Sequence, residues 1–384
     1  MSLYDVIIVG AGSVGIPIAL SCGRLGLKTA VLDRRPSPGQ GENKHAIGGI
    51  RATHSDPAKI VLCHRSLEVF SEWERVNGDN IEWIRGGYVF PVYRKEEETL
   101  LKSYLSIQKQ YHLNIDFVSP QKIRETIPGI NPKGLIGGTL SPNDGSASPL
   151  LAINAFSRKA MELGVAFEFN TTVHSVLKKE GAVIGVATDR GEFRAPVVVE
   201  AAGAGSRDLS QSVGCEMPVI PESHEAAITE PVQSFCHAMV VDLRPVPGSR
   251  NYYFYQNRHG QVVFCITPDP PIVGIDYRET ATFLPQVCRR MVELLPRLQS
   301  LRVRRVWRGL YPMTSDGSPI LGWNRDVKGL LHAAGMCGQG FMLGPGLGEV
   351  VGRMIIHSET EADRMVLERF SPYRDLSCGM EALK

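Results

Sequence analysis

The stretch that decides the fold reads Asp5-Val6-Ile7-Ile8-Val9-Gly10-Ala11-Gly12-Ser13-Val14-Gly15, and a helical pattern after it leads to Leu27-Lys28-Thr29-Ala30-Val31-Leu32-Asp33. In residues 5–9, the four residues after Asp5 are apolar and β-branched, which predicts a buried strand. The helical pattern runs to Leu25 and is predicted to end before Gly26. A second strand then ends at Asp33, 21 residues after Gly12. A G-x-G-x-x-G turn between a strand and a helix, with an acid at this spacing, predicts a Rossmann-type dinucleotide-binding unit.

Each glycine of this turn has a predicted task. Gly10 allows the tight turn, Gly12 lets a pyrophosphate approach the backbone, and Gly15 lets the helix pack closely on the strand. The helix N-terminus presents backbone N–H groups and a positive dipole to the phosphates. Asp33 is expected to accept hydrogen bonds from ribose hydroxyls, which disfavours NADP. This stretch alone leaves FAD and NAD both open.

Glycine is concentrated in a second, distant segment as well. Residues 1–50 and 309–352 hold 20 of the 39 glycines, whereas residues 215–308 hold three. In the second segment a strand over 330–334 meets a glycine turn, and a helix is predicted from about Pro345 to Ile356. We interpret the turn as a loop whose backbone N–H groups contact a planar cofactor ring. A tight turn that binds no ligand fits the same pattern. A long cofactor needs support at both ends, which favours FAD over NAD.

The composition is that of a packed globular protein. Of its residues, 43% are hydrophobic and 21% are charged. The length of 384 residues predicts two domains or one large one. A net charge of +2 gives no electrostatic reason for a nucleic-acid partner, and no apolar stretch is long enough to span a membrane. Without a signal-peptide pattern we expect a cytoplasmic protein with reduced cysteines. No cysteine or histidine spacing indicates a metal site.

Several short motifs follow one another in the order of a known family. They are Gly48-Gly49-Ile50-Arg51, Asp144-Gly145, Glu200-Ala201-Ala202-Gly203-Ala204, His224 to Pro231, Trp307-Arg308-Gly309, Asp316 to Gly322 and Gly338-Gln339-Gly340-Phe341. With the N-terminal fingerprint, these motifs make the chain resemble D-amino-acid-oxidase-type FAD-dependent amine oxidoreductases. More narrowly, it resembles the β subunits of heteromeric sarcosine oxidase and heteromeric proline dehydrogenase.

The resemblance implies an α/β plus α+β architecture. A discontinuous, Rossmann-type FAD-binding domain would comprise residues 1–86, 142–214 and 305–384. A substrate domain with a mixed β-sheet would comprise residues 87–141 and 215–304. Within it, residues 252–266 read as a β-hairpin, and residues 281–294 read as an amphipathic covering helix.

The resemblance also implies which residues bind FAD. The loop from Gly39 to Arg51 would run beneath the isoalloxazine ring, and the turn after Glu200 would pass near the pyrophosphate. The expected cofactor-binding residues are Gly10, Gly12, Ser13, Val14, Gly15, Asp33, Arg34, Lys44, His45, Gly49, Val173, Ala202, Gly203, Gly335, Gly338, Gln339, Gly340, Phe341 and Met342.

The implied chemistry is hydride transfer from an amino or imino acid to the flavin N5. Arg51 is the candidate to hold the substrate carboxylate, with a structural arginine as the alternative. His54, Tyr255 and Met342 are candidates for the substrate pocket, although histidines and sheet aromatics are often packing residues. His224 matches a histidine of the proline-dehydrogenase pattern and either acts in catalysis or ties the sheet.

Three departures from relatives refine this expectation. Residues 310–314 lack the cysteine that bonds the flavin in monomeric sarcosine oxidases, which indicates noncovalent FAD. Met342 replaces their oxygen-activating lysine, which favours a dehydrogenase over an oxidase. Residues 147–150 lack the FMN-bonding histidine of heteromeric sarcosine oxidase, so any FMN would be noncovalent.

The leading interpretation is a dehydrogenase subunit for a small proline-, hydroxyproline-, sarcosine- or opine-like substrate. Its electrons would pass to a redox α subunit, and FMN at the subunit junction stays open. One alternative is a stand-alone glycine or D-amino-acid oxidase that uses O2. Another is a flavin-binding scaffold subunit whose catalytic site lies elsewhere in a complex.

Overall fold

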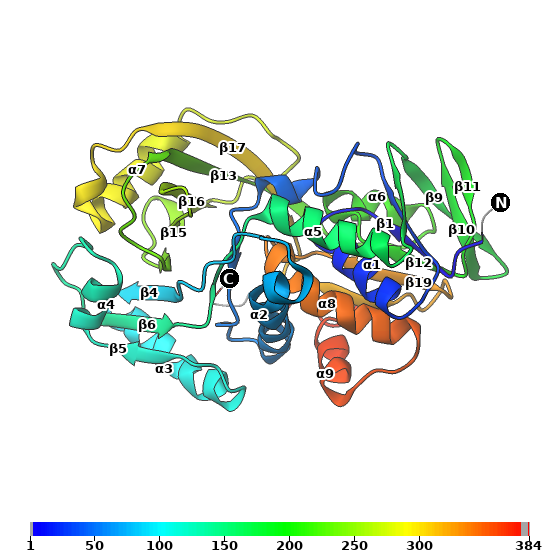
Figure 1. Ribbon diagram of the computed structural model, residues 1–384, viewed down its shortest axis with the longest axis horizontal. Coiled ribbons are helices and arrows are strands. Elements are labelled where there is room, and N and C mark those ends of the chain that lie inside the picture. The colour runs from blue at the N-terminus through cyan, green and yellow to red at the C-terminus, as the bar shows by residue number, and fades with distance from the viewer. Residues whose placement is uncertain (1–2, 378–382, 384) are drawn as a thin grey trace.

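Two sheets of different kinds lie side by side in the computed structural model (Figure 1). The structure describes residues 3–377 and 383. A six-stranded, mostly parallel sheet with its helices forms one half, and an eight-stranded mixed sheet forms the other. The fold class predicted from the sequence, a Rossmann-type FAD-binding unit with a mixed-sheet unit, is confirmed.

The parallel sheet has the strand order β18-β19-β12-β1-β2-β8. All neighbours are parallel except the pair β18–β19. Its strands are β1 (Val6–Val9), β2 (Thr29–Asp33), β8 (Ala166–Phe169), β12 (Val197–Glu200), β18 (Ile320–Trp323) and β19 (Leu330–Ala334).

Alternate residues of β1 enter different cores, which explains the continuous apolar run in the sequence. Val6 and Ile8 pack with helices α1 (Gly15–Arg24), α2 (Pro57–Asn77), α5 (Pro149–Glu162) and α8 (Gly340–Ile355). Ile7 and Val9 pack under a small antiparallel sheet and α6, which comprise β9 (Val173–Lys179), β10 (Ala182–Thr188), β11 (Gly191–Phe193) and α6 (Ser206–Gln211).

The first helix is as predicted, and the last glycine-rich helix is not. Leu25 is the C-cap of α1 and Gly26 follows with φ +74°, the left-handed conformation expected after a helix. The predicted start of the late helix near Pro345 is wrong, because α8 begins at Gly340 and carries Pro345 inside it.

The eight-stranded sheet has the order β17-β13-β16-β15-β14-β4-β6-β5. The predicted hairpin is confirmed as β15 and β16, joined by a turn over residues 257–260, and the covering helix is α7 (Phe283–Leu294). Its strands are β4 (Tyr88–Val92), β5 (Asp116–Val118), β6 (Gly137–Ser141), β13 (Ile220–Pro231), β14 (Met239–Asp242), β15 (Gly248–Gln256), β16 (Gln261–Asp269) and β17 (Val303–Met313).

One face of this sheet is covered by α7 (Phe283–Leu294), under which Tyr252, Phe254 and Phe264 are fully buried. The other face is turned toward the parallel sheet. The boundary expected between residues 304 and 305 falls inside β17, which pairs with β13 over its whole length. The domain boundaries otherwise stay a prediction.

Short elements complete the chain. They are η1 (Glu42–His45), β3 (Gly49–Ile50), α3 (Lys95–Gln110), α4 (Pro120–Thr126), β7 (Gly145–Ser146), η2 (Gly203–Gly205), η3 (Pro296–Leu298) and α9 (Glu361–Arg369). Within residues 3–377 and 383, no helix combines the length and apolar character needed to cross a bilayer. Over the same residues, no group of three or more histidine, cysteine, aspartate or glutamate side chains is arranged to hold a metal.

Candidate active site

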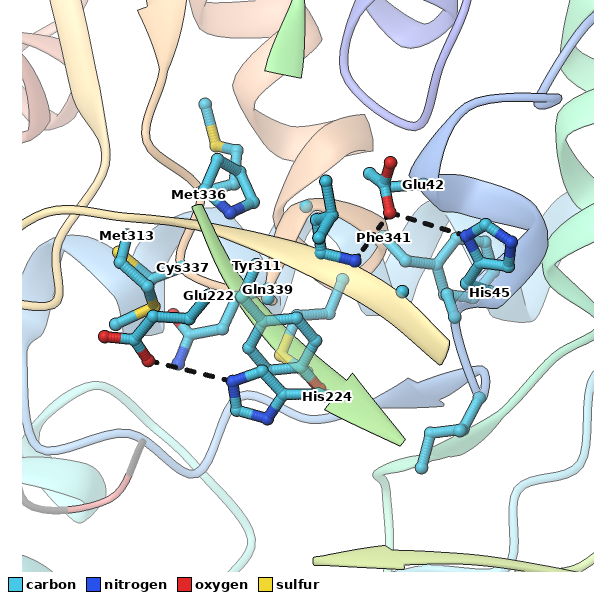
Figure 2. Close-up of a pocket in the computed structure, with 18 of the residues that line it drawn as sticks. Glu42, His45, Glu222, His224, Tyr311, Met313, Met336, Cys337, Gln339 and Phe341 are labelled. Carbon is cyan, nitrogen blue, oxygen red and sulfur yellow. Dashed lines mark hydrogen bonds and ion pairs between the residues drawn. The ribbon is translucent and has the colours of Figure 1, made fainter. Parts of the chain in front are cut away.

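A cavity of about 820 Å³ lies between the two sheets. One side is formed by the turn after β1, the end of β2, the turn after β12 and the start of α8. The other side is the inward face of the eight-stranded sheet, and the loop around η1 lies between them. Figure 2 shows side chains from the η1 loop, from β13 and β17 and from the start of α8 around one space.

The N-terminal turn provides a cradle for a bulky group. An added Cβ at Gly12 would meet no described atom within 4 Å, so this glycine faces open space. At Gly10 and Gly15 an added Cβ would lie 2.4 Å from the Ala201 carbonyl oxygen and 1.8 Å from the Gly10 carbonyl oxygen. Gly12 therefore leaves room for a ligand and Gly15 is required for close packing, as the fingerprint predicts. Gly10 has φ +115°, which agrees with its expected place in the tight turn.

Asp33 lies at the edge of this cradle and is already engaged by the backbone. Its Oδ2 accepts the backbone N–H of Ala11 at 2.7 Å, and its Oδ1 accepts that of Arg35 at 2.7 Å. Each carboxylate oxygen has a second lone pair, so Asp33 can still accept from a ribose hydroxyl. Its first role is to fix the turn.

The start of α8 forms the opposite wall of the cradle. Gln339 is 4% exposed, and neither polar atom of its side chain has a hydrogen-bond partner among the described residues. Buried amides are normally paired, so this one indicates a missing partner. The N-terminal N–H groups of a 16-residue helix begin next to it. Together with the space at Gly12, these groups fit an FAD molecule that spans from the first turn to α8.

The loop around η1 is held in place by Glu42. Its Oε1 accepts the Tyr277 hydroxyl at 2.6 Å, and its Oε2 accepts the backbone N–H of Leu310 at 2.6 Å. His45 Nδ1 lies 3.4 Å from Oε2 (Figure 2). Burial alone would raise the pKa of Glu42, but the hydrogen bonds from His45, Tyr277 and Leu310 outweigh it and hold the pKa below its usual range.

Arg51 is buried below the same loop. Its guanidinium donates to the backbone carbonyl oxygens of Thr53 and Leu383 and lies 5.8 Å from the ring centroids of Tyr88 and Phe90. An arginine has five N–H donors, so three remain for a ligand.

The nearby Asp144 is buried as well, and its Oδ1 accepts the backbone N–H of Ala52 at 3.1 Å. Burial raises the pKa of Asp144 to about 6, although the charge of Arg51 opposes this rise. A carboxyl with a pKa of about 6 is still mostly ionised at pH 7, so Asp144 balances part of the charge of Arg51.

The inward face of the eight-stranded sheet carries neighbouring side chains from adjacent strands. Strand register brings Val241, Tyr253, Cys265 and Ala226 next to one another, and all four line the cavity. The Tyr253 hydroxyl lies 3.0 Å from that of Tyr311. Burial raises the pKa of Tyr311 to about 12, so this hydroxyl keeps its proton at neutral pH.

His224 lies against Tyr311 with its ring 3.8 Å away and nearly parallel. Its Nε2 is 3.8 Å from Glu222 Oε2, as the dashed line in Figure 2 shows. All three residues line the cavity. The His224 ring thus borders the same cavity as the nucleotide-binding turn.

Most residues expected from the sequence come together in this cavity. The cavity is lined by Gly10, Gly12, Ser13, Val14, Asp33, Arg34, His45, Gly49, Arg51, Ala202, Gly203, Gly335, Gly338, Gln339, Gly340, Phe341 and Met342.

Five expected residues lie outside the cavity lining. Gly15 is packed behind the first turn, Lys44 is exposed, and Val173, the first residue of β9, is partly buried against the core. His54 is fully buried with Nε2 3.5 Å from Cys63 Sγ. Tyr255 lies on the cavity face of β15 but two residues past Tyr253, where it lines a separate space of about 150 Å³.

Some lining residues were not expected from the sequence. They are Glu42, Glu222, Tyr253, Tyr311 and Cys337. Strand alternation is a signal that could have found Tyr253 once Tyr255 was placed on the inward face, because residues two apart share a face. The pairing of Glu42 with residues 277 and 310 joins distant segments, and no local pattern reports it.

Residues 5–354 match the family described as DAO, FAD dependent oxidoreductase. Among solved structures, L-proline dehydrogenase from P. horikoshii is 27% identical, with a TM-score of 0.91 over 97% of this chain and 98% of that one. Glycine oxidase from Geobacillus kaustophilus is 23% identical, with a TM-score of 0.86 over 98% of this chain and 100% of that one, which shows the fold alone.

Among curated proteins, 4-methylaminobutanoate oxidase (formaldehyde-forming) from Paenarthrobacter nicotinovorans is 24% identical over 96% of this chain and 46% of its own length. The chain spans about half the length of the curated relatives it matches. The family match covers most of the chain and includes both glycine segments that line the cavity. The chain therefore belongs to the DAO family of FAD dependent oxidoreductases.

Proposed function

We propose that the chain oxidises a small amino or imino acid as a dehydrogenase with noncovalently bound FAD. The observation that carries this proposal is the single cavity that joins the nucleotide-binding turn to Arg51 and His224. When bound, FAD supplies the electron sink that accepts the substrate hydride at N5. L-proline dehydrogenase and 4-methylaminobutanoate oxidase, by their names, act on substrates of this class.

The chain's own residues would bind and orient the substrate. Arg51 provides a buried positive charge for the substrate carboxylate, with N–H donors left after its two backbone contacts. His224, held by its stack on Tyr311, would take the proton that the substrate ammonium must lose. The sheet face with Tyr253 would exclude water from the reacting atoms.

Met342 supports a dehydrogenase, because it lines the cavity where an oxygen-activating lysine would stand in an oxidase of the resembled family. A partner redox subunit would then receive the electrons, and a cytoplasmic location agrees with such a complex. No observation on the described residues supports FMN at a subunit junction, and FMN forms no part of this proposal.

The test uses the purified chain reconstituted with FAD. Anaerobic addition of L-proline, D-proline, hydroxyprolines, sarcosine, glycine and opines should bleach the flavin absorbance for at least one compound. Reoxidation by a dye should be faster than reoxidation by O2. Brisk peroxide formation would support an oxidase instead, and no bleaching by any amino or imino acid would reject the proposal.

The variant Arg51→Gln separates catalysis here from a scaffold role. Loss of one charge-assisted, carboxylate-binding contact should raise KM by about 10–100-fold. Arg65→Gln is the matched control, because Arg65 is exposed and pairs with Glu68 and Glu349 outside the cavity. Equal KM values for both variants would show that Arg51 does not hold the carboxylate.

A further inference from the structure

A second arginine lies in the cavity wall at a place where the sheet is irregular. β15 and β16 pair Ser249 with Pro268 and Asn251 with Thr267, so Arg250 is an extra residue on β15. Regular strands send neighbouring side chains to opposite faces, yet Arg250 and Asn251 both line the cavity. An extra residue of this kind is a β-bulge, which re-aims a side chain. The bulge therefore lets Arg250 line the cavity together with its neighbour Asn251.

The present partner of Arg250 holds it only loosely. Its Nε lies 3.4 Å from Asp269 Oδ1, and the two side chains are 42% and 48% exposed. An exposed pair of this kind contributes little, so a ligand carboxylate can compete for the arginine. Arg94 is brought to the same end of the sheet by the pairing of β4 with β14 and of β14 with β15, and it also lines the cavity.

Two glutamates, Glu96 and Glu97, also line this end of the cavity, but both lie outside the bulged strand. Glu97 Oε2 accepts the backbone N–H groups of Tyr93 and Arg94 at 3.3 and 3.2 Å, which caps α3. Glu96 is exposed, where water screens its charge. Arg250 is therefore the charged group that the local irregularity brings into the cavity lining.

We propose that Arg250 binds a second acidic group of the substrate. The substrate is then an amino or imino acid with two carboxylates, as in opine-like compounds. This inference rests on the proposed function, in which Arg51 holds the first carboxylate. Along β15, Arg250 is three residues from Tyr253, about 10 Å at ~3.3 Å per residue, so one small molecule can reach from the ring side to Arg250.

The experiment compares substrates that differ by one carboxylate. The pairs are proline with pyrrolidine-2,5-dicarboxylate and N-ethylalanine with N-(1-carboxyethyl)alanine, each assayed with the FAD-reconstituted chain and a dye acceptor. The dicarboxylate should have at least a tenfold higher kcat/KM. Arg250→Gln should lower that preference at least tenfold, chiefly through KM, and should leave the monocarboxylate unchanged.

Arg278→Gln is the matched control, since Arg278 is 89% exposed, pairs with Asp276 and does not line the cavity. It should leave the preference unchanged. A preference for monocarboxylates, or a preference that survives Arg250→Gln, would overturn the inference while leaving the proposed oxidation intact. If the chain oxidises neither monocarboxylic nor dicarboxylic amino or imino acids, the proposed function is rejected. A separate titration of flavin absorbance with both members of each pair then decides the inference: tighter binding of the dicarboxylate, lost in Arg250→Gln, would uphold it, and equal binding would overturn it.

Discussion

At the scale of single residues, the three glycines of the first turn perform different tasks although they belong to one motif. Gly12 borders open space, whereas Gly10 and Gly15 each press against backbone atoms. The motif therefore separates into a ligand-facing position and two packing positions. A substitution at Gly12 should affect cofactor binding, and one at Gly15 should affect folding.

We predict that Gly12→Val abolishes FAD binding with little change in the thermal midpoint of the apoprotein. The valine side chain would fill the space that the pyrophosphate needs, and an added Cβ there meets no described atom. Flavin retention after gel filtration and a melting curve without FAD measure the two effects. Gly15→Ala is the contrasting variant, since its Cβ would lie 1.8 Å from the Gly10 carbonyl oxygen. A stable Gly15→Ala protein, or Gly12→Val that retains FAD, would contradict this division.

At the scale of secondary-structure elements, the glycines of α8 lie where the helix packs closely against neighbouring backbone. An added Cβ at Gly344, Gly346 and Gly348 would lie 1.9 Å from the Ser13 oxygen, 2.2 Å from the Leu62 oxygen and 2.6 Å from the Pro17 backbone. These glycines let α8 approach α1 and α2. Among the glycines of residues 329–352, all of them described, only Gly335, Gly338 and Gly340 line the cavity, so much of the late glycine excess serves helix packing.

We predict that Gly346→Ala lowers the free energy of unfolding by about 1–3 kcal/mol, the usual cost of overpacking. Alanine favours a helix by about 1 kcal/mol over glycine, but the clash at 2.2 Å is with a backbone carbonyl that cannot swing away. Urea denaturation of the FAD-free protein measures the change. Gly41→Ala should be close to neutral, because its Cβ would meet no described atom within 4 Å. A Gly346→Ala variant as stable as the parent would show that α8 can move away from α2.

The elements that the sequence predicted best are those with a strong local signal. The first strand, the first helix with its terminal glycine and the β15–β16 hairpin follow from periodicity and turn residues alone. The start of α8 does not follow from the sequence, because proline and glycine locally favour a loop, whereas tertiary packing overrides that preference and the helix begins at Gly340. Tyr255 lies on the inward face of the sheet, but it lines the smaller, separate space and not the main cavity. Which residue of a strand reaches the main cavity depends on strand register, which the sequence does not show.

At the scale of the whole molecule, the site exists only where the two sheets meet. Its walls come from segments as distant as residues 10 and 342, and the bulge at Arg250 depends on how two strands of one hairpin align. Glu42 is a junction between these parts. It joins the η1 loop to β17 through Leu310 and to the segment after β16 through Tyr277. Glu42 therefore stabilises the packing of the η1 loop against the eight-stranded sheet beside the cavity.

We predict that Glu42→Gln lowers the thermal midpoint at pH 7 and that the difference from the parent shrinks on acidification. The pKa of Glu42 is lower in the folded protein than in the unfolded chain, so its charge contributes stability above the usual glutamate range. That contribution is lost as the pH falls through the lowered, folded-state pKa. Melting curves from pH 7 downward measure the difference. Glu72→Gln is the control, because Glu72 and Arg75 form an exposed pair with 51% and 74% exposed side chains. A constant difference across the pH range would mean that Glu42 acts through shape rather than charge.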